Sequence, residues 1–210
     1  MKNEKDEKKE IRKNILKVRD EISAEERASC NDKIKKYVLT QPVYEEAEAI
    51  LAYASYRSEV DTTALIRQAL ADGKYVFAPK VSGDEMEFWQ ITAMEDLREG
   101  YRGIPEPVER VSFPEWLAEQ SNAGKIHVMM WMPGAVFDKE RHRIGYGKGF
   151  YDRYLSRLTG LEKENCCKWS AELHLTTVAL AYSCQVLEQI PYESHDIRPD
   201  MLITEKGVLL

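Results

Sequence analysis

The chain lacks any apolar run long enough to cross a membrane, and its first residues lack the apolar core of a signal peptide. The segment from Met1 to Arg19 is instead dense in lysine and glutamate. We therefore expect a cytoplasmic protein that is not exported and has no membrane partner. Acidic residues outnumber basic ones, and the formal net charge is −6 at pH 7. This acidic balance argues against a protein whose main role is to bind nucleic acid.

Cysteine and histidine are scarce, with four of each in the chain. The cysteines show no CxxC spacing, and no histidine is paired with a cysteine at the spacing of a zinc finger. The neighbours Cys166 and Cys167 are poorly placed to bridge each other. These absences argue against a zinc site and favour reduced thiols in a cytoplasm.

Two common nucleotide-binding motifs are missing, because GxxxxGK[ST] does not occur and GxGxxG fails at its last glycine. The chain has instead a glycine-rich segment from Arg143 to Arg153, with the sequence RIGYGKGFYDR. Glycines let backbone N–H groups approach a ligand closely. Lys148 adds a point charge, and Arg143 adds a planar fork that matches phosphate oxygens. The segment follows an apolar strand and opens a helix, so it predicts an anion site with a nucleotide as the favoured ligand.

Local patterns predict an α/β protein in which helices alternate with short strands. Helices are expected at 4–20, 23–39, 61–72, 113–121 and 151–158. Strands are expected at 49–54, 75–81, 86–91, 127–132, 177–182 and 201–204. Residues 99–109, rich in glycine and proline, are predicted as a loop, and residues 160–171 as a polar surface excursion. The length of 210 residues suits one domain, spanning 1–210, with a largely parallel sheet.

Several acidic residues are candidates for a site, and each has an ordinary structural alternative. Asp152 is either a magnesium ligand beside phosphates or a favourable charge in the first turn of a helix. For Asp138, a role in stabilising a turn or capping a helix is at least as well supported as a role in a site. Glu59 follows a buried strand, where ligands of α/β sheets gather, and is either an acceptor for an amine-rich heterocycle or a solvated loop residue.

The two ends of the chain hold the remaining candidates. His195 and Asp196 form either a catalytic dyad or part of an ordered polar loop, and Asp196 is a second candidate metal ligand. Lys8, Lys9 and Arg12 are expected to form a solvated basic face unless the first helix folds over the nucleotide.

Together these blocks resemble the 5-formyltetrahydrofolate cyclo-ligase (5,10-methenyltetrahydrofolate synthetase) family. The matching blocks occur in family order at residues 8–12, 58–62, 133–138, 143–153 and 185–204. The resemblance implies a three-layer α/β/α sandwich with a largely parallel, mixed sheet. It also implies ATP- and magnesium-dependent cyclisation of 5-formyltetrahydrofolate to 5,10-methenyltetrahydrofolate, with release of ADP and phosphate. In that family the formyl oxygen attacks the terminal phosphate of ATP, and a folate nitrogen then closes the ring as phosphate leaves.

The resemblance further implies roles for individual residues. The ATP-binding set would be Lys8, Lys9, Arg12, Arg143, Ile144, Gly145, Tyr146, Gly147, Lys148, Gly149, Phe150 and Tyr151. The folate-binding set would be Ala54, Glu59, Tyr146, Gly147, Lys148, Gly149 and Phe150. Arg143 and Lys148 would be catalytic because they supply positive charge to the transferred phosphoryl group. Asp152 and Asp196 would hold magnesium.

The chain departs from the family pattern at two positions. Tyr146 stands where some members carry arginine, and Phe150 stands where tyrosine is frequent. Two other functions stay open: a sugar-phosphate isomerase that uses the anion site without ATP, and a non-catalytic module that binds a nucleotide or RNA. The intact set of Arg143, Lys148 and Asp152 favours an enzyme over the module, and the acidic balance argues against RNA. We expect the protein to act as a monomer.

Overall fold

A computed structural model describes residues 4–100, 103–120, 124–160, 172–193 and 196–210. In these ranges a seven-stranded sheet has the order β12-β11-β9-β6-β1-β2-β3. The inner strands run parallel, and they are β11 (Met201–Thr204), β9 (Glu172–Leu180), β6 (Lys125–Met132), β1 (Ala49–Leu51) and β2 (Tyr75–Ser82). The antiparallel edge strands are β12 (Gly207–Leu209) and β3 (Glu85–Ile91). The prediction of a mixed, largely parallel sheet is confirmed.

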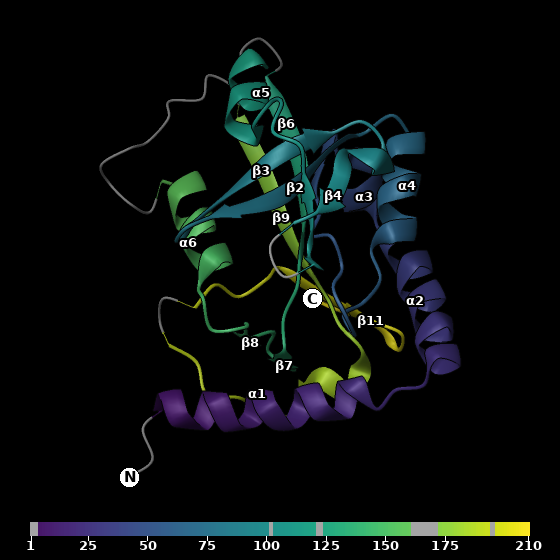
Figure 1. Ribbon diagram of the computed structural model, residues 1–210, viewed down its shortest axis with the longest axis vertical. Helices are drawn as coiled ribbons and strands as arrows, with labels where there is room; N and C mark the ends of the chain where they lie inside the picture. The colour runs from purple at the N-terminus through teal and green to yellow at the C-terminus, as the bar shows by residue number, and fades with distance from the viewer. Residues whose placement is uncertain (1–3, 101–102, 121–123, 161–171, 194–195) are drawn as a thin grey trace.

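Helices cover both faces of this sheet (Figure 1). One face carries α2 (Ala24–Leu39), α3 (Pro42–Glu46) and α4 (Thr63–Ala71), and the other carries α5 (Phe113–Glu119) and α6 (Phe150–Leu158). The layers form because successive strand residues point to opposite faces. In β6, Met129 and Trp131 pack with α2 to α4, whereas Val128 and Met130 pack with α5 and α6. The expected three-layer sandwich is therefore confirmed.

A second, small sheet lies beyond the carboxyl end of β6. Its strands are β10 (Val186–Leu187), β7 (Val136–Asp138) and β8 (Arg143–Ile144). The long helix α1 (Glu4–Asp20) runs along this end of the molecule, next to β7 and β8 (Figure 1). Ile11, Ile15 and Leu16 of α1 pack against a small apolar cluster that includes Val136 and Ile144. This contact brings the basic residues of α1 to the glycine-rich segment.

Helix starts follow the local chemistry that the sequence predicts. The Ser23 hydroxyl accepts a hydrogen bond from the Glu26 N–H at 3.1 Å, and α2 begins at the next residue. The Asp61 carboxylate accepts one from the Thr63 N–H at 2.8 Å at the start of α4. Each described helix is too short or too polar to span a bilayer.

Other local predictions were wrong. Residues 99–109 are not all loop, because β5 (Pro105–Pro107) pairs with β4 (Leu97–Glu99). The strand expected at 49–54 ends at 51, and the strand expected from 177 begins at 172. Val18, expected on the apolar face of the first helix, is 46% exposed. The excursion expected at 160–171 falls, from residue 161 onward, outside the described residues.

Candidate active site at the carboxyl end of the sheet

The glycine-rich turn connects β8 to α6. It does not follow the long strand β6 directly, as the sequence suggested, because the β7–β8 hairpin lies between them. Gly147 and Gly149 have φ angles of +91° and +64°, a left-handed region that favours glycine. Gly149 is also the residue that precedes α6, so the free N–H groups of the helix start at the turn. Arg12 of α1 supports the turn by donating from Nε to the Gly145 carbonyl at 2.7 Å.

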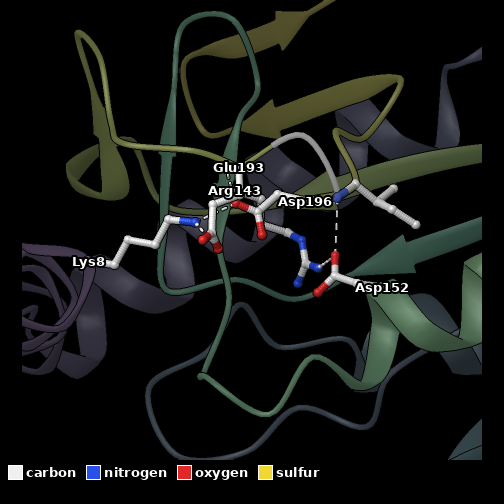
Figure 2. Close-up of polar contacts among 6 residues, drawn as sticks. Lys8, Arg143, Asp152, Glu193 and Asp196 are labelled. Atoms are coloured by element: carbon white, nitrogen blue, oxygen red, sulfur yellow. Dashed lines mark hydrogen bonds and ion pairs between the residues drawn. The ribbon is translucent and has the colours of Figure 1, made fainter. Parts of the chain in front are cut away.

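A buried ion pair joins the start of this turn to α6. Arg143 Nη2 lies 2.7 Å from Asp152 Oδ1, and the Arg143 side chain is 5% exposed. Asp152 Oδ1 also accepts a hydrogen bond from the Ile197 N–H at 3.2 Å (Figure 2). The Arg143 Nε atom is buried without a hydrogen-bond partner among the described residues. The guanidinium therefore ties the start of the turn to α6 and places a positive charge beside the turn.

Lys8 reaches the same region from α1. Its Nζ lies 2.5 Å from Asp196 Oδ2 and 3.3 Å from Glu193 Oε2, and Asp196 Oδ2 also accepts from the Glu193 N–H at 2.8 Å. Burial opposes the charge of Lys8, but hydrogen bonds and charges from Asp196 and Glu193 raise its pKa above the ordinary value. Figure 2 shows Lys8 on one side and Asp152 on the other, with Arg143 and Asp196 between them. The first helix therefore packs against the glycine-rich turn and the segment of Glu193 and Asp196.

The chain segment that carries Asp196 lies beside Asp152, the other carboxylate expected to bind magnesium. Asp152 accepts a hydrogen bond from the N–H of Ile197, which directly follows Asp196. Within the described part of the chain, no group of three or more metal-ligating side chains is present. Magnesium is usually held by one or two carboxylates together with substrate phosphates. The pair of oxygen donors beside a phosphate-type site therefore fits magnesium in that mode.

Glu59 lies on the other side of the glycine-rich turn and is half-buried. One of its carboxylate oxygens accepts from the Tyr56 N–H at 2.9 Å. Burial raises the pKa of Glu59, although its hydrogen bonds and the nearby charge of Arg19 oppose the increase. Ala54 lines a neighbouring cavity of about 350 Å³, together with Thr62, Met94 and others. The residues that were expected to bind two different ligands thus meet at one turn.

Residues 4–205 of the chain match the sequence pattern of the 5-formyltetrahydrofolate cyclo-ligase family. The chain belongs to this family. It is 30% identical to the mitochondrial 5-formyltetrahydrofolate cyclo-ligase of Arabidopsis thaliana, over 96% of this chain and 75% of that protein. It is 28% identical to the 5-formyltetrahydrofolate cyclo-ligase of Mus musculus, over 88% of this chain and 86% of that protein.

Solved structures agree with this assignment. The NMR structure of Aquifex aeolicus 5,10-methenyltetrahydrofolate synthetase superimposes with a TM-score of 0.75 at 33% identity, covering 96% of this chain and 91% of that one. The structure of a 5,10-methenyltetrahydrofolate synthetase from Mycoplasma pneumoniae gives a TM-score of 0.64 at 22% identity. This match covers 94% of the present chain and 98% of the other, and it supports the fold.

The remaining residues predicted for this cyclo-ligase fold differ in exposure. Lys148 and Tyr146 are exposed at the turn, and Phe150 is half-buried at the start of α6. Ile144 is buried in the cluster beneath α1, and burial raises the pKa of the Tyr151 hydroxyl well above its ordinary value. Lys9 is exposed on α1. His195 lies outside the described residues, so its dyad with Asp196 stays a prediction.

Sequence reasoning missed one buried residue of this cyclo-ligase site. The Arg19 side chain donates from Nη1 to the Tyr146 hydroxyl at 2.9 Å and from Nε to the Ser58 hydroxyl at 3.0 Å. Lys8, Arg12 and Arg19 follow one another at spacings of four and then seven residues, which places all three on one helical face. That spacing was the signal that could have found it.

Asp138 is a structural residue rather than part of the site. Its side chain is fully buried, and its oxygens accept from His142 N at 2.8 Å and Ile190 N at 3.3 Å. The His142 ring nitrogen Nδ1 lies 3.0 Å from the same carboxylate. The turn-stabilising alternative for Asp138 is therefore the one the structure supports.

Removing this carboxylate is expected to destabilise the fold. Asp138→Ala leaves backbone N–H donors unpaired, and we expect the free energy of unfolding to fall by about 2–4 kcal/mol. Urea unfolding measures this change directly. Asp138→Asn keeps an acceptor at the same place and should lose less. A loss below about 1 kcal/mol for the alanine variant would contradict the structural role.

Proposed function

We propose that the protein converts 5-formyltetrahydrofolate to 5,10-methenyltetrahydrofolate, with ATP consumed to ADP and phosphate and with magnesium required. The observation that carries this proposal is the glycine-rich turn, which has the Arg143–Asp152 pair on one side and Glu59 on the other. One turn can thereby serve a phosphate chain and a nitrogen-rich ring together. Family membership supports the reaction, and the whole chain would act as one domain.

The chemistry explains why a phosphate site and a folate site must be adjacent. A formamide carbon is a poor electrophile, so the formyl oxygen first attacks the terminal phosphorus of ATP and ADP departs. The neighbouring arm nitrogen of the folate then attacks the formyl carbon and loses its proton. The bond from carbon to the phosphorylated oxygen breaks, and phosphate leaves with the former formyl oxygen. Both steps depend on holding two reactants in line, which is a positioning task.

The chain's own groups suit the first step. Arg143 has a buried, unused Nε donor, and Lys148 and the N–H groups at the start of α6 lie at the same turn. Such groups stabilise the negative charge that develops on a transferred phosphoryl group. Lys8, Lys9 and Arg12 would contact the nucleotide from α1. The buried residues Ile144 and Tyr151 would contribute through their backbone and packing.

Asp152 and Asp196 would hold magnesium. When bound there, the ion supplies positive charge to the nucleotide phosphates. Lys8 now contacts Asp196, so this ammonium would share the carboxylate or move toward the phosphates.

Glu59 would bind the folate by accepting hydrogen bonds from its amine-rich ring. Ala54 would lie beside that ring, at the 350 Å³ cavity. Tyr146, Gly147, Gly149 and Phe150 would line the space between the two ligands.

The expected setting of this reaction is a monomer in the cytoplasm that binds no nucleic acid. Within the described residues Cys30 and Cys184 are free thiols, which supports a reducing compartment. The formal charge of −6 supports a small-molecule substrate over a nucleic-acid partner.

Direct product formation tests the proposal. Purified protein should generate the near-ultraviolet absorbance of 5,10-methenyltetrahydrofolate only when 5-formyltetrahydrofolate, ATP and magnesium are all present. Omission of each component in turn provides the controls. Product without ATP, or no product in the complete mixture from protein that still binds ATP, would overturn the proposal.

Lys148 provides a residue-level test of the same reaction. Lys148→Ala should lower kcat by at least about tenfold, because a charged contact to the transferred phosphoryl group is lost. Lys17→Ala is the matched control, since Lys17 is an exposed lysine of α1. Steady-state rates at saturating substrates measure the effect. Near-normal kcat in Lys148→Ala would remove Lys148 from the mechanism.

A further inference from the structure

A chain of hydrogen bonds crosses the site from α1 to the loop after β1. Arg19 donates to the Tyr146 hydroxyl of the glycine-rich turn at 2.9 Å and to the Ser58 hydroxyl, beside Glu59, at 3.0 Å. Because Arg19 has only donors, the Tyr146 hydroxyl accepts this hydrogen bond. Burial and the charge of Glu59 raise the pKa of Tyr146 above its ordinary value.

Arg19 also fixes the loop that carries Glu59. Its Nε donates to the Ser58 hydroxyl at 3.0 Å, and Ser58 in turn donates to the neighbouring Asp20 carboxylate. The arginine is buried, with 5% of its surface exposed, and its guanidinium carbon lies 5.9 Å from the centre of the Tyr146 ring. The planar fork thus holds the glycine-rich turn with one nitrogen and the Glu59 loop with another.

The same helix grips the turn at a second point. Arg12 donates to the Gly145 carbonyl at 2.7 Å, one residue before Tyr146. Arg12 and Arg19 are seven residues apart on α1, so both face the turn. Tyr146 is therefore held by its backbone neighbour on one side and by its hydroxyl on the other.

This arrangement connects the two ligand sites of the proposed function. We propose that Arg19 is a positioning residue that, by holding Tyr146 and Ser58 together, couples the glycine-rich turn to the loop of Glu59, so that nucleotide and folate strengthen each other's binding. A nucleotide that orders the turn also holds Tyr146 and, through Arg19 and Ser58, the loop that carries Glu59. The folate then meets a carboxylate that is already oriented, so its binding has a smaller entropic cost of ordering the protein. The inference rests on the proposed function, because it assigns the turn to ATP and Glu59 to folate.

Binding measured without turnover tests this coupling. Wild-type protein is titrated with 5-formyltetrahydrofolate in magnesium buffer, in the absence and the presence of a saturating non-hydrolysable ATP analogue. The ratio of the two dissociation constants is the coupling factor, which we expect to be about five- to twentyfold in the wild type. The reciprocal titration must give the same factor, because coupling between two ligands is symmetric.

Three variants separate positioning from a general structural effect. Arg19→Lys keeps the charge but cannot reach both partners as a fork, and Tyr146→Phe keeps the ring but loses the hydroxyl. Each should reduce the coupling factor to below about twofold, and the affinity for the nucleotide analogue alone is measured beside it, so that any loss of nucleotide binding is separated from the loss of coupling. The double variant should show no further loss, since the two residues act as one unit.

A matched control comes from the last turn of α6, at the end of the helix away from the glycine-rich turn. Arg157 of α6 also has two partners, the Met86 carbonyl and the Glu87 carboxylate. Arg157→Lys should keep the full coupling factor. Independent binding of the two ligands in the wild type, or full coupling in Arg19→Lys, would overturn the inference. If the wild type binds neither ligand, alone or with the other present, the proposed function itself is overturned.

Discussion

Replacing Arg143 with glutamine is expected to lower kcat by about 10²–10³-fold, the loss typical of removing one donor from a site where charge develops. Arg143 is buried, holds Asp152 at 2.7 Å and retains an unused Nε donor facing no partner in the described structure. Glutamine removes the charge and the fork together. The kcat of Arg143→Lys should lie between those of the wild type and Arg143→Gln, because lysine restores a charge without the planar geometry.

Initial rates at saturating ATP and folate measure this effect. The unfolding midpoint in urea shows whether Arg143→Gln is folded, and binding of a non-hydrolysable ATP analogue shows whether the site is still formed. A folded variant that retains kcat within about threefold of the wild type would contradict the assignment of Arg143 to the reacting phosphate.

Replacing Asp152 with asparagine is expected to reduce kcat/KM for ATP in magnesium buffer by about a hundredfold, at the upper end of losses seen when a metal site is disturbed. Asparagine has the same size and can still accept from Arg143 and the Ile197 N–H, so the fold around it should be kept. The charge that would attract magnesium is lost.

The dependence of the rate on magnesium concentration measures this loss. Calorimetric titration of magnesium into protein with a non-hydrolysable nucleotide gives a second measurement that does not depend on turnover. Asp72→Asn is a suitable control, because Asp72 ends α4 and bonds to Tyr44 and Gln68 away from the site. An unchanged magnesium dependence in Asp152→Asn would remove this residue from the metal site.

The parts of the fold that the sequence predicted are those with a long or chemically marked local signal. The helix after Ser23 is defined by its capping serine, and β6 by an apolar run. The β7–β8 hairpin has strands of three and two residues, too short to show a period. The same limit hid the pairing of β4 with β5, in a segment whose prolines favour a loop.

The residues of the candidate site also differ in how far the sequence alone could predict them. The glycine-rich turn was found because its residues are consecutive and its chemistry is local. Arg19 was missed because its partner Tyr146 is 127 positions away in the sequence, so only the packing of α1 brings them together. Asp138 shows the reverse case, because its fully buried position was needed to choose between a ligand role and a turn role. Sequence patterns therefore predict which residues carry chemistry better than they predict which residues support them.

Helix α1 stands apart from the two large apolar clusters, since its apolar side chains pack only into the small cluster around Val136 and Ile144. Yet it carries Lys8, Arg12 and Arg19. Assembly of the sandwich and competence for substrates therefore depend on different stretches of polypeptide. We therefore expect a protein that lacks the residues up to Asp20 to keep its two large apolar clusters while losing the three basic side chains that α1 brings to the glycine-rich turn, so a folded sample is no guarantee of an active one.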